Sequence, residues 1–190
     1  LEPNPEVRVS LANKAMDYAG SVLEQITAKY PSAIVLSGGG TGTYNITGKH
    51  PSVTELQAGS FVFMDSFHGN LAPIFEISLT VLTTVTARHK NRITLDAGRK
   101  SIGIDFAPPR IKNSDLVANF CAEEHAIFDI HSEDKIHLGD RLELVSGYAP
   151  TTVNLHDVIF VIEDNKVVEL WPVFPRGPQD KGFLSSLQNN

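Results

Sequence analysis

A glycine-rich run at residues 38–43 is the feature that most constrains this chain. It holds four glycines together with Thr41 and Thr43, and it follows a short apolar run, residues 33–36, that we expect to be a buried strand. Glycine lacks a Cβ and adopts positive φ readily, so consecutive N–H groups can point into one concavity. A strand ending in such a loop is typical of a phosphate site built from backbone N–H donors and a hydroxyl.

The spacing of the glycines narrows the kind of phosphate. No Gly-Lys-Ser/Thr follows and no helix is evident after Thr43, so neither the P-loop pattern nor the dinucleotide fingerprint is present. This favours a single terminal phosphate, such as that of pyridoxal phosphate, over a nucleotide. The alternative is a plain glycine-rich turn that binds nothing.

Composition excludes several other classes of protein. The net charge is −6, so a nucleic-acid partner would find no basic surface. No apolar run approaches the roughly 18 residues that span a bilayer, and no signal peptide is evident. Cys121 is the only cysteine, which excludes an internal disulfide and a multi-cysteine zinc motif. We expect a cytoplasmic protein with no membrane partner.

The first segment reads as one amphipathic helix. Asn4-Pro5 resembles an N-cap followed by a proline in the first turn, and Tyr30-Pro31 ends the helical spacing of apolar residues. Helix, strand and glycine loop form half of a βα repeat. Because such a unit cannot bury its own apolar faces, we expect it to belong to an α/β domain or to dock onto one.

Beyond about residue 58 the sequence changes to short β-rich segments with polar turns. Two turns are predicted, at residues 137–140 and 163–166. The expected strands cover residues 60–64, 74–86, 92–96, 117–128, 141–145, 153–162 and 167–171. Many short strands with tight turns predict an antiparallel barrel or sandwich.

Several motifs, taken in order, resemble one enzyme family. They are SGGGTGTY at 37–44, TELQAGSFVFMD at 54–65, DAGRKS at 96–101, EEH at 123–125, TVNLHD at 152–157, WPV at 171–173 and RG at 176–177. This series closely resembles the C-terminal half of D-threonine aldolases and the related D-serine dehydratases, pyridoxal-phosphate enzymes of the alanine-racemase fold. The resemblance covers residues 5–177, and the long match at 54–65 is its most specific part.

The resemblance implies an architecture and a cofactor site. Residues 1–58 would close an N-terminal (β/α)₈ barrel, residues 59–178 would form an all-β C-terminal domain, and residues 179–190 would be a tail. Gly39, Gly40 and Thr41 would hold the phosphate of pyridoxal phosphate, with Gly38 shaping the turn. The family also implies a homodimer that acts on a small D-amino acid.

The sequence departs from the family at the Schiff-base lysine. Family members carry it near the start of the barrel, before anything that this sequence matches, so it is expected outside this chain. Lys100 is the candidate substitute, although a charged residue at a strand end explains it as well. We therefore expect a fragment, or one piece of a split enzyme, that is inactive alone.

A second departure affects the metal site of the family. A His-x-Asp or His-x-Cys pair binds a divalent ion there, whereas this sequence aligns Tyr148-Ala149-Pro150. Proline has no ligand atom and neutral tyrosine is a poor ligand, so no metal is expected. Tyr148 would instead donate its phenol proton to the substrate hydroxyl, or it would only fill the pocket.

Several further residues have a structural as well as a functional interpretation. His125 either faces the active site or is structural. His156 and Asp157 are read as scaffold, because adjacent strand residues point to opposite faces and cannot share one ion. Cys121 is expected in the core. Trp171 is expected to pack the β domain or a subunit interface.

The leading hypothesis is the C-terminal part of a pyridoxal-phosphate lyase for β-hydroxy-D-amino acids, with D-threonine-aldolase-like cleavage. The alternatives within the family are D-serine-dehydratase-like elimination and metal-free racemase chemistry. An alternative outside enzymes is a non-catalytic β module for dimerisation or substrate gating.

Overall fold

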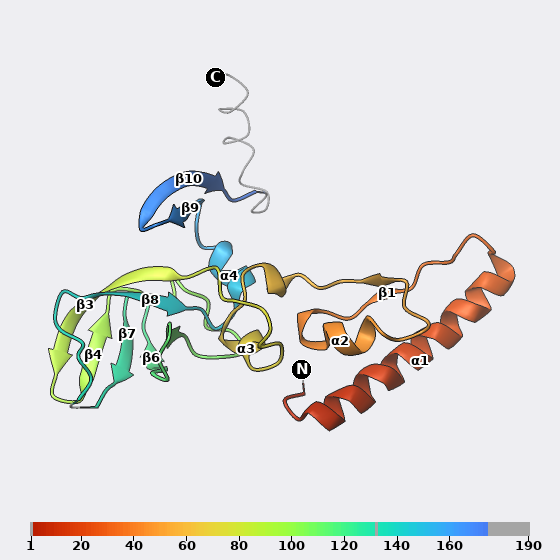
Figure 1. Ribbon diagram of the computed structural model, residues 1–190, viewed down its shortest axis with the longest axis horizontal. Coiled ribbons are helices and arrows are strands. Elements are labelled where there is room, and N and C mark those ends of the chain that lie inside the picture. Colours follow the sequence, from red (N-terminus) through yellow and green to blue (C-terminus); the bar gives the residue numbers. More distant parts are fainter. Residues whose placement is uncertain (1, 132, 175–190) are drawn as a thin grey trace, which may run out of the picture. The chain divides into compact units, whose positions relative to one another are not determined.

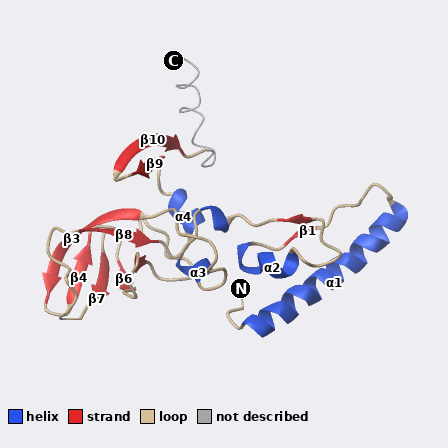
Figure 2. Ribbon diagram, viewed as in Figure 1, coloured by secondary structure: helices blue, strands red, loops and turns tan. Residues whose placement is uncertain are grey.

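The computed structural model describes residues 2–131 and 133–174, and the expected tail at 179–190 lies outside them. The chain divides into two compact units, residues 1–80 (unit 1) and residues 81–190 (unit 2). Unit 1 contains the helix α1, while most of the strands belong to unit 2 (Figures 1 and 2). No helix within the described ranges is long and apolar enough to cross a membrane.

Helix α1 (Pro5–Lys29) confirms the prediction at both ends. The Asn4 side chain accepts hydrogen bonds from the N–H groups of Glu6 and Val7 at 3.0 and 3.1 Å. Tyr30 caps the C-terminus. Gly20 is the buried residue of α1, whereas Leu11 remains exposed. The helix therefore presents an apolar face that the described part of unit 1 leaves uncovered.

The strand expected at residues 33–36 is wrong in position. Strand β1 is Ser37–Gly38, which pairs in parallel with β2 (Glu55–Leu56). Ile34 and Val35 are 66% and 61% exposed. These apolar residues are typical of a buried strand, but in the described structure no neighbouring element covers them. A helix does follow the glycine run, contrary to expectation: a 3₁₀ turn, η1 (Thr41–Thr43), continues into α2 (Tyr44–Thr47).

Residues 60–64 do not form the expected strand, since the first three of them make a 3₁₀ turn. Turn η2 (Ser60–Val62) precedes the short helix α3 (Ser66–Gly69), which Asp65 caps by accepting the His68 N–H at 2.7 Å. The ring of Phe75 packs against Tyr44 and Phe61, which joins this segment to the rest of unit 1. The domain boundary expected at residue 58 thus falls inside a compact unit, and the domain assignment stays a prediction.

Unit 2 is built around one antiparallel sheet, as predicted. Its strands lie in the order β5-β8-β3-β4-β7-β6. They are β3 (Val81–His89), β4 (Arg92–Leu95), β5 (Arg110–Ile111), β6 (Ala118–Cys121), β7 (Ala126–Asp129) and β8 (Arg141–Val145). An antiparallel bridge joins Arg110 of the edge strand β5 to Val117 beside the other edge strand, β6. The sheet is therefore a nearly closed barrel.

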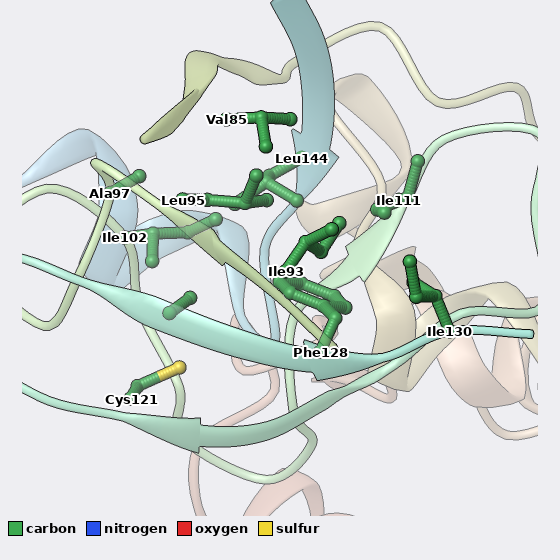
Figure 3. Packing of buried hydrophobic residues seen from close by; sticks show 11 residues of the cluster. Val85, Ile93, Leu95, Ala97, Ile102, Ile111, Cys121, Phe128, Ile130 and Leu144 are labelled. Carbon is green, nitrogen blue, oxygen red and sulfur yellow. The ribbon is translucent and has the colours of Figure 1, made fainter. Parts of the chain in front are cut away.

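The core of unit 2 lies inside this barrel. Ile93, Leu95, Phe128 and Leu144 are fully buried and come from three different strands. Their side chains gather in one interior (Figure 3). Strands β4 and β7 contribute alternate residues to this interior, as expected where one face of a curled sheet is buried.

The remaining strand predictions are correct in part. Strand β8 and the turn at 137–140 match the prediction. Residues 117–128 form two strands, and residues 74–86 enter a strand only at Val81.

The end of unit 2 carries a short helix and a separate hairpin. Residues 153–162 divide between α4 (Ala149–Val153) and β9 (Val158–Glu163), which pairs with β10 (Lys166–Pro172). The β9–β10 turn at 163–166 is confirmed; Asp164 and Asn165 both have positive φ, as a tight hairpin turn requires.

Candidate functional site

The glycine loop is shaped by two glycines in different environments. Gly39 has a φ of +75°, and a Cβ there would lie 2.7 Å from the Thr47 side chain. Gly40 is extended, with a φ of −169°, and a Cβ there would meet nothing within 4 Å. The backbone at Gly40 therefore borders open space that a ligand can approach, whereas Gly39 makes the sharp turn that exposes it.

Thr41 is the threonine best placed to donate a hydroxyl from this loop. It is 3% exposed, and its Oγ1 accepts the Phe61 N–H at 3.0 Å. This bond uses an oxygen lone pair and leaves the hydroxyl hydrogen for another acceptor. Gly38 belongs to β1, and its carbonyl accepts the Gln57 N–H at 3.1 Å. A loop held from two sides in this way suits a terminal phosphate.

Tyr148 lies at the start of α4, in unit 2. The residue is half-buried, and its ring meets the ring of Phe106 edge to face, with 5.0 Å between centroids and an interplanar angle of 90°. Pro150 is exposed and supplies no ligand atom. Within the described ranges, no three His, Cys, Asp or Glu side chains are grouped so that they could hold a metal ion.

Lys100 has the surroundings of a surface ion pair. Its Nζ lies 2.6 Å from Oε1 of Glu124, and both side chains are more than half exposed. The hydrogen bond and the charge of Glu124 raise the pKa of Lys100 above its usual value, which keeps the amine protonated. A protonated, solvated amine is a poor nucleophile, so this geometry favours the structural interpretation of Lys100.

The histidines expected near the site are placed differently. His125 is exposed, in the turn between β6 and β7 that packs against Gly98. His156 and Asp157 precede β9, so the assumption that they share a strand is wrong. His156 Nε2 lies 2.7 Å from the Ser101 carbonyl oxygen, to which it donates. This bond ties the segment between α4 and β9 to the loop after β4 and agrees with a scaffold role.

Cys121 belongs to the core of the barrel, as predicted. It is 7% exposed; burial raises the pKa of its thiol, and the Arg99 guanidinium lowers it again in part. Less thiolate is therefore present at a given pH than for a free cysteine. Trp171 lies on β10 and is 50% exposed, so among the described residues no packing buries it fully.

We expect a disulfide reagent at pH 8 to modify Cys121 at least about 100-fold more slowly in the native protein than in urea, since the reactive species is an exposed thiolate. The measurement follows release of the coloured thiol product. Because Cys121 is the only cysteine, the signal needs no correction for other thiols. Equal rates in the two conditions would contradict its place in the core.

Two features of the structure were not predicted from the sequence. The first is a buried pair in unit 1: Asp65 is fully buried, and its carboxylate oxygens lie 2.9 and 3.1 Å from Nδ1 of His68. The three-residue spacing of an N-cap is its only sequence signal. The second is Phe106, which has a φ of +64° and is 71% exposed. No local signal predicts positive φ at a phenylalanine.

Comparison with known proteins agrees with the family suggested by the motifs. Residues 78–162 match the model of the putative serine dehydratase domain. The chain is 33% identical to a D-threonine aldolase of Arthrobacter sp over 179 residues, which cover 90% of this chain and 47% of the relative. It is 29% identical to a 3-hydroxy-D-aspartate aldolase of Paracoccus denitrificans, covering 94% of this chain and 48% of the relative.

A solved structure extends the agreement to the fold. The crystal structure of D-threonine aldolase from Filomicrobium marinum superposes with a TM-score of 0.84 at 26% identity, over 91% of this chain and 49% of that one. The chain thus spans about half the length of the curated relatives it matches, consistent with their C-terminal half. It belongs to the D-threonine aldolase and D-serine dehydratase-like family.

Proposed function

We propose that this chain is the C-terminal part of a pyridoxal-phosphate-dependent lyase for β-hydroxy-D-amino acids. The glycine loop is the observation that carries the proposal, because it offers open backbone at Gly40 beside the buried hydroxyl of Thr41. The relatives named as aldolases of D-threonine and 3-hydroxy-D-aspartate support the substrate class. When bound, pyridoxal phosphate supplies the electron sink for breaking a bond at the substrate Cα.

The chain's own contribution begins with the phosphate. The N–H group of Gly39 and the hydroxyl of Thr41 would hold it, and the Phe61 N–H would keep Thr41 Oγ1 in place. The Gly40 N–H donates to Thr43 Oγ1 at 3.3 Å in this structure and would turn to the phosphate in place of that hydroxyl. Gly38 ends β1 and starts the turn. Holding the phosphate would also orient the reactive end of the cofactor, although the glycine loop would not contact that end.

Tyr148 is the chain's candidate for proton transfer. Its phenol would donate to, or take a proton from, the substrate's β-hydroxyl at Oη. The edge-to-face contact with Phe106 restricts movement of the Tyr148 ring as a whole and so limits where the phenol oxygen lies. Cleavage between Cα and Cβ is the leading reaction. The match of residues 78–162 to the serine dehydratase model favours loss of water from the same substrates as the second candidate.

The proposed partner of this chain is the other half of the enzyme, which is either part of the same protein or a second chain. Leu11 and Ile26 of α1 are 54% and 43% exposed, and Ile34 and Val35 are exposed beside β1. Further strands and helices of a (β/α)₈ barrel would bury this apolar surface. That half would also carry the lysine that binds the cofactor. A cytoplasmic homodimer completes the proposal.

The test uses the enzyme formed by this chain and the barrel half, assayed for cleavage of D-threonine with and without a chelator. We expect activity to survive chelation, since Tyr148 and Pro150 replace metal ligands of the resembled family, and Tyr148→Phe to lower kcat by about 100-fold. The double variant Tyr148→His with Pro150→Asp should become dependent on manganese. Tyr18→Phe, at a tyrosine of α1 that is 74% exposed, is the matched control.

Two outcomes would contradict this proposal. If the unaltered enzyme loses activity on chelation and regains it with manganese, the interpretation of Tyr148 and Pro150 is wrong. If neither cleavage nor elimination of any β-hydroxy-D-amino acid is detected with the cofactor bound, the non-catalytic alternative is favoured.

A further inference from the structure

Thr43 has the position of a helix cap but does not act as one. It directly precedes α2, where a threonine usually accepts a hydrogen bond from an N–H group of the first helical turn. Among the described residues its side chain makes no such bond. Thr43 Oγ1 instead accepts the Gly40 N–H at 3.3 Å. The side chain of Thr43 therefore holds the glycine loop and does not cap the helix.

A second buried hydroxyl keeps Thr43 in this position. Thr47 is 1% exposed, and its hydroxyl donates to Thr43 Oγ1 at 3.2 Å. Thr43 itself is 9% exposed, so water competes little for its oxygen. The Thr43 N–H also donates to the Gly40 carbonyl at 3.0 Å, which keeps the two residues together. The loop is thus closed on itself by contacts that need no ligand.

The Gly40 N–H is also a donor that the proposed phosphate site would use. A Cβ at Gly40 would meet nothing within 4 Å, so a ligand can approach the backbone there. One N–H group has one hydrogen to donate, and an incoming phosphate oxygen must take it from Thr43 Oγ1. Breaking this internal bond offsets part of the free energy gained when the phosphate binds.

Resting on the proposed function, we infer that Thr43 is an internal competitor of the cofactor phosphate. Its oxygen holds the Gly40 N–H in the free protein and releases it when the phosphate binds. The hydrogen bond from Thr47 remains in both states, so the oxygen of Thr43 keeps a partner after the exchange. Thr43 thereby lowers the affinity of the loop for phosphate and keeps the empty loop ordered.

The experiment compares Thr43→Val, which has a similar shape without the hydroxyl, with Thr43→Ser, which keeps the hydroxyl. Equilibrium dialysis measures the affinity of the enzyme that contains this chain for pyridoxal phosphate and for pyridoxal. We expect Thr43→Val to bind pyridoxal phosphate at least about threefold more tightly and pyridoxal as before. Thr43→Ser should retain the wild-type affinity for both compounds.

Stability separates competition from a merely structural role. Thr43→Val should lower the melting temperature, because the buried hydroxyl of Thr47 loses its acceptor in the free and the bound protein alike. A residue that only shaped the loop would weaken binding as it lost stability. Thr27→Val is the matched control: the Thr27 hydroxyl donates to the Ala33 carbonyl at 2.7 Å, outside the glycine loop, so its loss should lower stability and change neither affinity.

The outcomes distinguish this inference from the proposed function. Equal or weaker binding of pyridoxal phosphate by Thr43→Val, an equal gain for pyridoxal, or the same gain in Thr27→Val would overturn the role of Thr43, while cleavage of D-threonine by the wild-type enzyme would leave the lyase intact. A gain confined to pyridoxal phosphate, in an enzyme that cleaves and dehydrates no β-hydroxy-D-amino acid, would overturn the lyase and leave Thr43 as the competitor. A wild-type enzyme that binds no pyridoxal phosphate would overturn both.

Discussion

Gly147→Ala is expected to destabilise unit 2 by roughly 3 kcal/mol, since the added methyl group has no space. A Cβ at this position would lie 1.8 Å from the Ala107 carbonyl oxygen and 3.1 Å from that of Gly103. Both are backbone atoms, which cannot rotate away as a side chain can. The Gly147 N–H also donates to the Gly103 carbonyl at 2.8 Å. If the segments at Gly103 and Gly147 moved apart to make room for the methyl group, this hydrogen bond would break.

The measurement is urea unfolding followed by circular dichroism, with the midpoint and slope fitted together. Gly139→Asn is the control in the same unit: Gly139 has a φ of +87° but open space around its Cβ position, and asparagine tolerates such a conformation. We expect the control to change the stability by less than about 1 kcal/mol. A Gly147→Ala protein that unfolds at the wild-type midpoint would show that the segments at Ala107 and Gly147 are not in contact.

Elements with local signals could be predicted from the sequence. Helix α1 begins where Asn4 caps it and ends before Pro31, and both signals act over a few residues. The β9–β10 turn was predictable because Asp164 and Asn165 tolerate positive φ. These elements needed no knowledge of distant partners.

Elements that depend on distant partners could not be placed in the same way. The ladder at β1 starts at Ser37, where Glu55 is available to pair, although residues 33–36 have the stronger strand composition. The turn that separates β6 from β7 is fixed from outside, because the N–H groups of Arg99 and Lys100 donate to the carbonyls of Ala122 and Glu123. A period-two alternation of apolar residues predicts a strand, but it shows neither where pairing starts nor which distant segment holds a turn.

The candidate site shows the same division. The glycine loop was predictable because glycine itself permits the conformation that Gly39 adopts. The conformation of Phe106 was not, since a phenylalanine reaches positive φ only when tertiary contacts, here those of Asp105 and Gly147, impose it. The Asp65–His68 pair was missed because its burial gives it importance, and burial is a result of tertiary packing that a three-residue spacing does not contain.

Gly40→Ala is expected to weaken binding of pyridoxal phosphate at least about tenfold while leaving the stability of unit 1 unchanged. The backbone at Gly40 is extended and its Cβ position is open, so alanine fits the free protein. In the complex, the methyl group would occupy space that the phosphate needs. Gly39→Ala should instead lower both stability and binding, because its φ is +75° and the Cβ would lie 2.7 Å from Thr47.

Equilibrium dialysis of the enzyme against pyridoxal phosphate, and against pyridoxal as the compound without phosphate, measures this contrast. If the loop holds the phosphate, Gly40→Ala changes the affinity for pyridoxal phosphate and leaves that for pyridoxal as it was. Gly59→Ala, at a second glycine with open space around it, should affect neither compound. Wild-type affinity of Gly40→Ala for pyridoxal phosphate would mean that residues 38–43 are a plain glycine-rich turn, since a ligand resting on the backbone there could not tolerate a side chain.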